Sequence, residues 1–546
     1  MKKYLLLLAM LAIASCKNDS SESENIQSEV DSVATDSVEE MEFKVLDSRF
    51  IDQDEMWKPF EDDLADFSPE VYEEVKALVF EKSIPEIQKS IDQGKLSYEE
   101  VALFYLMRIK EYDRDNEFSL NSVISLNPNL IEEARKKDQM KDRLSNKHPI
   151  YGIPVLLKDN INTQALPTTA GAVALEDNLT RDAFIVKQLK DNGALILGKA
   201  NLSEWAYFFC GDCPSGYSAV GGQTLNPYGR KIHDTGGSSS GSGVAVSANL
   251  APVAVGSETS GSILSPSSAN SVVGLKPTIG LLSRGGIVPI SSTLDTPGPM
   301  TKFVVDNAIL LSAMTGKDPK DPSSSLVPED KPRNYYEGLE GSDLKGKRFG
   351  AIKSLMEDTL YVRAVNDLKN AGAEIVEFEA EDIDLPNFIR LLNLDMKKDL
   401  PEYFQNYGGE SNFRNVQDVV DYNLKDSVAR APYGQALFLG IIEDSATAEE
   451  FAAIKDTLRR NGTRFFEVPM KQHKLDAVLS VNNYHAGYAA VAKYPAITVP
   501  MGYTSENRPK GLTIIGKPFS EQELLKWAYA YELTTERRKT PADYNE

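Results

Sequence analysis

The sequence predicts an α/β protein in which helices flank a large mixed β-sheet. From about residue 150 on, short apolar runs alternate with loops rich in glycine and serine, as buried strands do. Residues 344–380 have the pattern of a β-α-β unit, and residues 385–460 have a mostly helical pattern with many charges. The expected strands outside the β-α-β unit are 153–157, 194–197, 253–255, 272–275, 475–481, 496–500 and 512–515.

The first fifteen residues have the pattern of a lipoprotein signal peptide, separate from the fold. Two lysines precede an apolar run, residues 4–13, that is too short to span a bilayer. The run ends in Ile-Ala-Ser-Cys16, which resembles the lipobox of bacterial lipoproteins, where the cysteine becomes the lipidated first residue. An ordinary secretory signal with an incidental cysteine is the alternative. We expect a lipid anchor at Cys16 in the bacterial envelope and, because Lys17 follows, in the outer membrane.

A flexible acidic tether, residues 16–45, is expected after the signal. Residues 17–42 carry nine acidic side chains and one lysine. Such a segment buries too little apolar surface to offset the entropy lost on ordering. Residues 46–546 then form the folded domain.

Capping signals predict helices at both ends of this domain. Pro85 can occupy the first turn of a short helix. Ser97 and Glu100 have the spacing of a capping box for the next helix. We expect the last helix to be capped by Ser520 together with Glu523.

Composition excludes some classes of function. The formal net charge is −22, which is unsuited to sequence-independent binding of nucleic acid. Cys210 and Cys213 form a lone C-x-x-C pair, whereas a zinc site needs about four ligands. In an exported protein we expect a local disulfide, and a redox motif is the alternative.

Residues 236–262 have the composition of an active-site segment. The segment begins GGSSSGSG and ends GSETSGS, with an apolar stretch between the two loops. Glycines let backbone N–H groups approach a ligand closely, and a loop of such groups can stabilise an oxyanion. A flexible linker is the alternative, but the small apolar residues between the loops have the pattern of a buried helix and strand.

A serine nucleophile in these loops needs a base. None of the four histidines has an evident catalytic setting. Lys158 ends the apolar run GIPVLLK, and burial at the end of a strand would lower its pKa toward the neutral form. A lysine that reaches the surface with its ammonium group fits this position equally well.

The chain resembles the amidase signature family of serine hydrolases over roughly residues 80–540, most weakly between 316 and 470. The motifs that carry the resemblance are YGIPVLLKDNINT, ALILGKANLSEW, GGSSSGSGVAVSANLAPVAVGSETSGSILSPSSANSVVGLKPT, LSRGGIVPISSTLDTPGPM and YPAITVPMG. The resemblance implies the amidase signature fold and hydrolysis of an amide without a cofactor or a metal.

The same resemblance implies a Ser-Ser-Lys triad. The lysine of the family falls on Lys158, the serine that follows a cis peptide bond falls on Ser238, and the nucleophile falls on Ser262. Lys158 would accept a proton from Ser238, which accepts one from Ser262. The oxyanion hole would be formed by the backbone N–H groups of Thr259, Ser260 and Gly261.

Two departures from the family pattern lie in the nucleophile loop. The usual loop is G-T-D-x-G-G-S, and here it is G-S-E-T-S-G-S. Glu258 replaces the aspartate, as in members that resemble peptide amidases. Ser260 replaces a glycine, which bears on the geometry of the oxyanion hole.

Three other functions fit parts of the pattern. The run GSSSG also matches the nucleophile elbow of α/β-hydrolases, with Ser239 as nucleophile and His473 or His485 as base. Residues 193–199 match G-x-x-x-x-G-K, but Ala200 stands where an NTPase needs a hydroxyl. An exported binding protein with a degenerate amidase site is the third alternative.

The expected substrate is a peptide C-terminal amide or a small organic amide. GGQTLNPY, the Glu258 loop, DMKKDLPEYF and DVVDYNLKD look similar to segments of bacterial peptide amidases. We expect residues 150–300 to hold the catalytic machinery and residues 385–460 to shape the substrate entrance. The family also includes the amidase subunit of a cytoplasmic tRNA-linked amidotransferase, a role that an export signal disfavours. The oligomeric state is left open.

Overall fold

The computed structural model describes residues 40–409 and 412–545. The compact unit begins at Glu40. The predicted signal peptide and Cys16 lie outside the described residues. Within the described part of the chain, every helix is too short or too polar to cross a bilayer.

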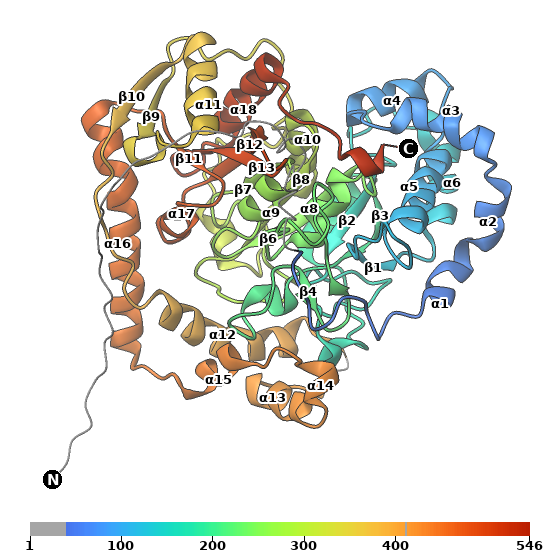
Figure 1. The fold of residues 1–546 in the computed structure, drawn as a ribbon, viewed down its shortest axis with the longest axis horizontal. Helices are drawn as coiled ribbons and strands as arrows, with labels where there is room; N and C mark the ends of the chain where they lie inside the picture. The colour runs from blue at the N-terminus through green and yellow to red at the C-terminus, as the bar shows by residue number, and fades with distance from the viewer. Residues whose placement is uncertain (1–39, 410–411, 546) are drawn as a thin grey trace, which may run out of the picture. The chain divides into compact units, whose positions relative to one another are not determined.

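A large mixed sheet, as the sequence predicted, forms the centre of this unit (Figure 1). The strand order is β1-β3-β2-β6-β8-β7-β12-β13-β11-β9-β10. The strands are β1 Val123–Leu126, β2 Pro154–Lys158, β3 Leu195–Ala200, β6 Val253–Glu258, β7 Val273–Lys276, β8 Thr296–Thr301, β9 Arg348–Ile352, β10 Glu374–Phe378, β11 Ala477–Val481, β12 Ala496–Tyr503 and β13 Pro509–Ile515. A separate two-stranded sheet pairs β4 Tyr217–Ser218 with β5 Gly222–Gln223.

The direction of the strands in the sheet decides which strand ends lie next to each other. β3, β2 and β6 are mutually parallel, and Leu157 of β2 lies opposite Val255 of β6. The carboxyl ends of β2 and β6 therefore lie side by side. The predicted β-α-β unit is also present, because β9 and β10 are parallel and joined by α11, Thr359–Asn370.

Strand β8 was not predicted, and two prolines explain why. Pro297 and Pro299 lie in the middle of the strand, and proline is usually confined to sheet edges because it lacks an N–H donor. β8 is nevertheless internal: it pairs along its whole length with β6, whereas β7 pairs with its last two residues, Met300 and Thr301. The prolines therefore lie beyond the part of β8 that faces β7.

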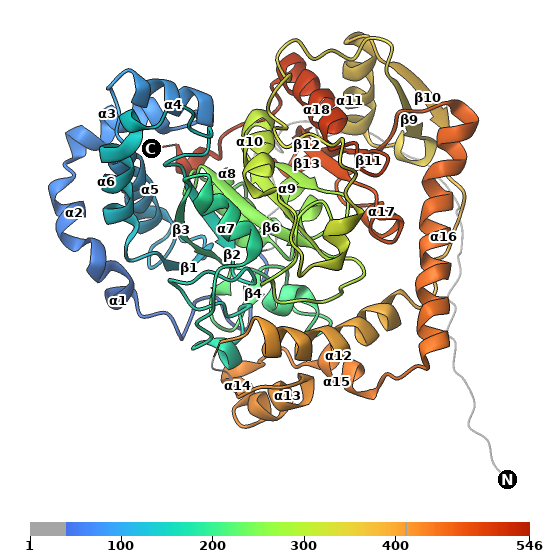
Figure 2. The same ribbon diagram turned by 180° about the vertical axis from the view of Figure 1, so that it is seen from behind.

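Helices from most of the segments that connect the strands flank the sheet, whereas the β7–β8 and β12–β13 connections contain no helix. Those before β9 are α1 Gln53–Trp57, α2 Glu61–Asp66, α3 Pro69–Val79, α4 Ile84–Asp92, α5 Tyr98–Tyr112, α6 Leu130–Met140, α7 Phe184–Asp191, α8 Ser240–Ser247, α9 Leu264–Ala269 and α10 Val304–Met314. Those that follow α11 are α12 Phe388–Asn406, α13 Val416–Leu424, α14 Ser427–Arg430, α15 Ala436–Glu443, α16 Ala448–His473, α17 Ala486–Ala492 and α18 Glu521–Thr535. Figure 2 shows α1–α6 grouped together and α12–α15 grouped separately.

The predicted caps agree with the structure in two cases of three. Pro85 lies in the first turn of α4, and Ser97 and Glu100 form a complete capping box on α5. The prediction for α18 was wrong. Ser520 has φ −102° and ψ 24°, away from the extended conformation of a capping residue, and its hydroxyl donates to the Lys517 carbonyl instead.

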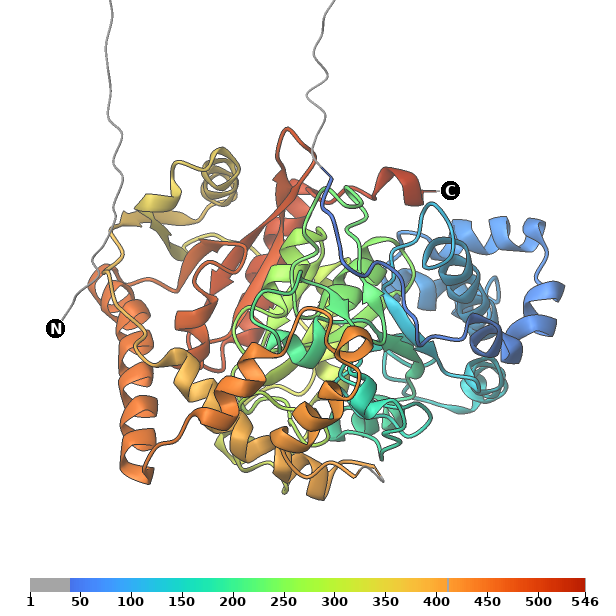
Figure 3. The ribbon, with the colours of Figure 1, turned by 60° about the horizontal axis from the view of Figure 1, so that its bottom comes forward.

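The segment predicted to be helical and rich in charge is confirmed as α12 to α16 (Figure 3). α12 packs against α13, α15 and α16, and α16 continues to His473, beyond the predicted limit. Apolar side chains of α12, α13, α15 and α16 share one buried cluster with residues of the loops that follow β2 and β3. This helical region is therefore attached directly to the loops at the end of the sheet.

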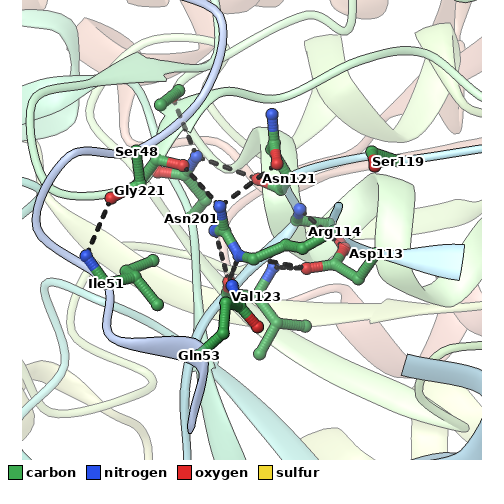
Figure 4. Close-up of polar contacts among 12 residues, drawn as sticks. Ser48, Ile51, Gln53, Asp113, Arg114, Ser119, Asn121, Val123, Asn201 and Gly221 are labelled. Atoms are coloured by element: carbon green, nitrogen blue, oxygen red, sulfur yellow. Dashed lines mark hydrogen bonds and ion pairs between the residues drawn. The ribbon is translucent and has the colours of Figure 1, made fainter. Parts of the chain in front are cut away.

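Residues 40–52 run over a buried polar cluster beside β1 and β3 (Figure 4). The Arg114 guanidinium donates to Val123 O, Asn121 Oδ1 and Gly221 O. The side-chain amide of Asn121 donates in turn to Leu46 O. Phe43, Val45 and Leu46 also pack on the apolar core, so residues 43–45, which we assigned to the tether, contact the folded unit.

Candidate active site

Lys158 is the last residue of β2 and is fully buried. Its Nζ lies 2.7 Å from Ser238 Oγ and 3.0 Å from the carbonyl oxygen of Ser257. Burial lowers the pKa of Lys158 to about 7, while the more distant carboxylates of Asp295 and Glu258 oppose that fall. The amine is therefore close to half neutral at physiological pH and can accept a proton.

Ser238 follows a cis peptide bond from Gly237, as the resemblance implied. Its carbonyl oxygen accepts a hydrogen bond of 3.0 Å from the backbone N–H of Ser203. The next N–H, that of Ser239, donates to the carbonyl of Ser262 at 3.1 Å. Ser238 is thus held between the amine of Lys158 and the backbone of Ser262.

Ser262 lies on the loop between β6 and α9. Oε2 of Glu258, the last residue of β6, accepts hydrogen bonds from the N–H groups of Ile263 (2.7 Å) and Leu264 (3.0 Å). This carboxylate bridges the loop and fixes the start of α9. Gly261 has φ +95°, a backbone conformation that favours glycine, and a Cβ there would lie only 3.0 Å from Nδ2 of Asn483.

The backbone N–H groups of Thr259, Ser260 and Gly261 donate to no other group of the described residues. Three adjacent unpaired donors next to Ser262 are the arrangement that stabilises an oxyanion. The donor at Ser260 is its backbone N–H, which serine has as well as glycine. These are the three positions that the family resemblance implies for the oxyanion hole, and that role stays a prediction.

Asp295 holds the beginning of the same loop. Its Oδ1 accepts from the Thr259 hydroxyl at 2.6 Å, and its Oδ2 accepts from the N–H groups of Ile290 and Ser291. Burial raises the pKa of Asp295 to about 6, although these hydrogen bonds favour the charged form. We did not single out Asp295 from the sequence; its signal was its place in the motif STLDTPGPM.

A buried ion pair supports the end of β2. Lys199 Nζ lies 3.0 Å from Asp159 Oδ1, and both side chains are fully buried. Lys199 also donates to Ile161 O at 2.7 Å and to Thr168 Oγ1 at 2.9 Å. The sequence analysis considered Lys199 only as part of a phosphate-binding motif, whereas the structure places it directly beside the residue that follows Lys158.

A cavity of about 220 Å³ lies against the loop that precedes Ser262. Its walls come from the loop after β6, from the segment that leads into β8, and from one face of α12. Its polar lining residues include Asn160, Glu258, Thr259, Arg284, Asp295, Lys320, Asp321, Asp399, Glu402, Tyr403 and Asn406. The helical region that we expected to shape the substrate entrance thus lines this cavity through α12.

The family of this chain is decided by the match to a family model. The model for the family described as Amidase matches residues 100–525, which is most of the chain. The chain belongs to the amidase family. The fold and the family that the sequence predicted are therefore confirmed.

Individual amidases resemble the chain over most of their length. A probable amidase of Arabidopsis thaliana is 36% identical over 480 residues, covering 84% of this chain and 91% of the relative. The structure of the native peptide amidase from Stenotrophomonas maltophilia is 37% identical with a TM-score of 0.80, covering 86% of this chain and 99% of the other. A glutamyl-tRNA(Gln) amidotransferase subunit from Caldanaerobacter subterraneus is 32% identical, covering 83% of this chain and 96% of the relative.

The alternative based on Ser239 and a histidine finds no support in the geometry of this amidase. The Ser239 hydroxyl donates to Ser257 O at 3.0 Å. His485 Nδ1 is bonded to Ser480 Oγ at 2.6 Å, and burial lowers the pKa of this imidazole to about 4. The ring of His473 packs beside Phe378. Both histidines are thus engaged elsewhere.

Cys210 and Cys213 are joined by a disulfide in the structure, and both are buried. They follow three residues with left-handed backbone conformations, Trp205, Ala206 and Tyr207, with φ of 51°, 56° and 77°. Such conformations are strained for residues other than glycine. The Tyr207 hydroxyl donates to Cys213 O at 2.9 Å, which connects this turn to the disulfide loop. Across the described residues, no cluster of three metal-binding side chains occurs.

Proposed function

We propose that this amidase hydrolyses a carboxylic amide with Ser262 as nucleophile, Ser238 as proton relay and Lys158 as base. The observation that carries the proposal is the buried amine of Lys158, with a pKa near 7, at 2.7 Å from Ser238 Oγ. A serine hydroxyl becomes an effective nucleophile only when a neighbouring group takes its proton.

The reaction begins when Ser262 Oγ attacks the amide carbon. The proton of Ser262 passes to Ser238 Oγ while the proton of Ser238 passes to neutral Lys158. The negative charge on the carbonyl oxygen is stabilised by the N–H groups of Thr259, Ser260 and Gly261. The proton then returns through Ser238 to the leaving nitrogen, which departs as ammonia or an amine.

Deacylation uses the same relay, with water in the place that Ser262 has in acylation. A water molecule gives its proton to Ser238, which again gives one to Lys158, and the resulting hydroxide attacks the acyl carbon on Ser262. Collapse of the second tetrahedral intermediate returns the proton to Ser262. The carboxylic acid leaves, and the enzyme is regenerated without a cofactor.

Substitution of each of the three residues by alanine tests this mechanism. On an amide that the native enzyme hydrolyses, we expect kcat/KM to fall by about 10³-fold or more in Ser262→Ala and in Lys158→Ala. It should also fall strongly in Ser238→Ala, because the three residues act as a unit. His485→Ala, whose ring is bonded to Ser480, serves as the control and should keep its activity. Near-normal turnover in Ser262→Ala would exclude the mechanism, as would loss of all activity in a folded His485→Ala.

The substrate we propose is a peptide C-terminal amide or a small organic amide. The similarity to the Stenotrophomonas maltophilia peptide amidase supports it, and so do the charged and amide side chains in the cavity wall, such as Asn160, Asp399 and Glu402, which an acyl chain would leave unused. The test is kcat/KM for a dipeptide amide, a simple aliphatic amide and a long-chain fatty amide. A clear preference for the fatty amide would reject this substrate class and leave the catalytic assignment intact.

The relatives named as amidotransferase subunits favour a second candidate, release of ammonia from glutamine for a partner enzyme. We propose free hydrolysis instead, because residues 1–16 have the pattern of an export signal. Glutamine is the discriminating substrate. Ammonia release from glutamine that exceeds release from dipeptide amides would favour the amidotransferase role.

We also propose that the mature chain is tethered to a bacterial membrane through lipid on Cys16. The support is the sequence pattern of residues 1–17. Several acyl chains on one residue hold a protein at a bilayer far better than one chain does. The binding-protein alternative predicts the same tether with no turnover, so the alanine substitutions above separate the two.

A further inference from the structure

The cavity beside the Ser262 loop contains acceptors that lack donors. Asn160 Oδ1, Glu258 Oε1 and Asp399 Oδ1 are buried and accept no hydrogen bond from the described residues. Each is the free half of a side chain whose other half is bonded: Asn160 Nδ2 to Ser257 Oγ, Glu258 Oε2 to Ile263 N, and Asp399 Oδ2 to Ser292 N. Among the described residues that line the cavity, no buried side-chain donor is left unpaired.

Positive charge in the cavity wall does not balance these acceptors. Arg284 lines the cavity, but its guanidinium is committed to Asp321, with Nε–Oδ2 at 3.0 Å and Nη2–Oδ1 at 2.6 Å, and to Ser323 Oγ. Lys320 is exposed. Burial lowers the pKa of Lys276 to about 8 against the opposing charge of Glu258, and Lys276 is not among the residues that line the cavity.

Of these acceptors, the carboxylate of Asp399 is the one that nearby positive charge balances least. It is 5% exposed, and its nearest cation is Lys398 Nζ, at 3.8 Å from Oδ1. That lysine is itself exposed and also lies 3.6 Å from Glu402, a second acid at the cavity. Burial and the neighbouring Asp395 raise the pKa of Asp399, as expected for a carboxylate with too little positive charge around it.

We propose that this cavity binds the ammonium group of the substrate, so that the preferred substrate is an amide carrying a protonated amine. An ammonium brings three N–H donors and a positive charge, which complements acceptors that are buried and unpaired. A carboxylate or an apolar group would leave those acceptors without partners, which is unfavourable. The proposal rests on the amide hydrolysis proposed above and specifies its substrate.

The position of the cavity fits an amine one or two residues from the bond that is cleaved. Thr259 lines the cavity and precedes Ser262 by three residues, a stretch of chain that spans at most about 11 Å. In an extended dipeptide amide the α-ammonium lies about 7 Å from the carboxamide carbon. The amide at Ser262 and an ammonium in the part of the cavity that Thr259 lines can therefore belong to one small molecule. A metal ion is a poorer occupant, because the described residues offer no group of three suitable ligands.

The test compares glycyl-leucinamide with N-formylglycyl-leucinamide, which lacks the charge. At pH 7 the free α-amine is mostly protonated. We expect kcat/KM to be about tenfold or more higher for the charged peptide. In Asp399→Asn this preference should fall about tenfold, because the larger loss of kcat/KM is expected on the charged peptide. Glu443→Gln, an exposed acid on α15 away from the cavity, is the matched control and should keep the full preference.

Several outcomes would overturn the proposal. One is an equal kcat/KM for the two peptides in the native enzyme. Another is an equal loss of kcat/KM on both peptides in Asp399→Asn, which would show that this residue only holds the turn at Ser292. If Asp399→Asn does not fold, Glu402→Gln is measured in its place. We expect the preference for the charged peptide to fall about threefold in this variant. An unchanged preference would count against the proposal.

Binding of the two peptides to Ser262→Ala tests this subsite independently of amide hydrolysis. Calorimetry with the same two peptides should show about tenfold tighter binding of the charged one even without turnover. If the native enzyme hydrolyses no amide, the proposed function fails, and the binding difference still decides the subsite. If the native enzyme hydrolyses both peptides equally and Ser262→Ala binds both equally, the proposed function stands and this inference fails.

Discussion

The Thr259 hydroxyl donates a hydrogen bond of 2.6 Å to Asp295, and this contact joins the nucleophile loop to the turn at residues 290–295. The same turn is held on its other side by α12, where Asp395 accepts from the Ser291 hydroxyl and Asp399 accepts from Ser292 N. Three carboxylates thus connect the loop before Ser262 to the helix that lines the cavity.

Replacement of Asp295 by Asn should shift the pH dependence of catalysis without unfolding the loop. The amide oxygen can still accept from the two backbone N–H groups, and the amide nitrogen can donate to Thr259, whose hydroxyl can accept. Loss of the charge removes a group that raises the pKa of Lys158. The acid limb of the kcat/KM profile should therefore move to lower pH by about 0.3–1 unit. Asp421→Asn, on the exposed side of α13, is the control, and a shift to higher pH would contradict the electrostatic role.

Lys158→Met should abolish turnover and stabilise the fold. Below about pH 7 the buried lysine is charged in the folded state, so the full penalty of burying that charge is present. Between about pH 7 and its ordinary pKa of 10.5 the unfolded chain binds the extra proton, so the stability of the native protein rises with pH in this window. We expect the variant to be more stable by about 1–3 kcal/mol at pH 7, with a gap that narrows toward pH 10.

Urea unfolding of both proteins from pH 6 to pH 10 measures this gap. The methionine variant fills a similar volume without a titrating group. Parallel stability curves for the two proteins would show that Lys158 does not titrate in this range, and the assignment of this lysine as the base would lose its basis.

The Cys210–Cys213 pair should be oxidised in protein isolated from its native envelope. The prediction follows from the proposed export of the chain and from the pairing of the two cysteines in the structure. The loop it closes is very short, so Cys210→Ser should lower the free energy of unfolding by only about 1–2 kcal/mol. Mass spectrometry after alkylation without reductant decides the redox state, and two alkylated thiols would reject the disulfide.

Cys16→Ser should release the enzyme from the membrane fraction. The acyl chains are expected on this residue, and the described part of the chain has no helix that could replace them as an anchor. Cys210→Ser is the matched control, because it removes a different cysteine and should leave the protein with the membranes. Fractionation of Cys16→Ser with membranes as before would show that the lipobox interpretation is wrong.

The sequence was most informative where chemistry requires a particular residue type. Lys158 at the end of an apolar run and the two glycine-serine loops could be recognised from the sequence as candidate site residues. The structure brings Lys158, Ser238 and the backbone of Ser262 together. Burial of Lys158 could not be decided from its position, because it depends on β3 and β6, which pair with both sides of β2.

Other features depend on contacts between segments far apart in the sequence. Asp399 lies more than 100 residues from the turn that it holds, so no local pattern marks it as part of the cavity. Lys199 was hidden by a motif of another class, and β8 was hidden by Pro297 and Pro299. In each case tertiary context overrides a local rule.

The three-carboxylate connection bears on how this enzyme could be altered to accept new substrates. A mutation at Asp395 or Asp399 changes the cavity and also loosens the turn beneath the nucleophile loop, so selectivity and turnover would change together. Glu402 and Asn406 line the same cavity from α12 and are not bonded to that turn. Directed evolution that starts from these two positions can explore new side chains while the geometry around Ser262 is preserved.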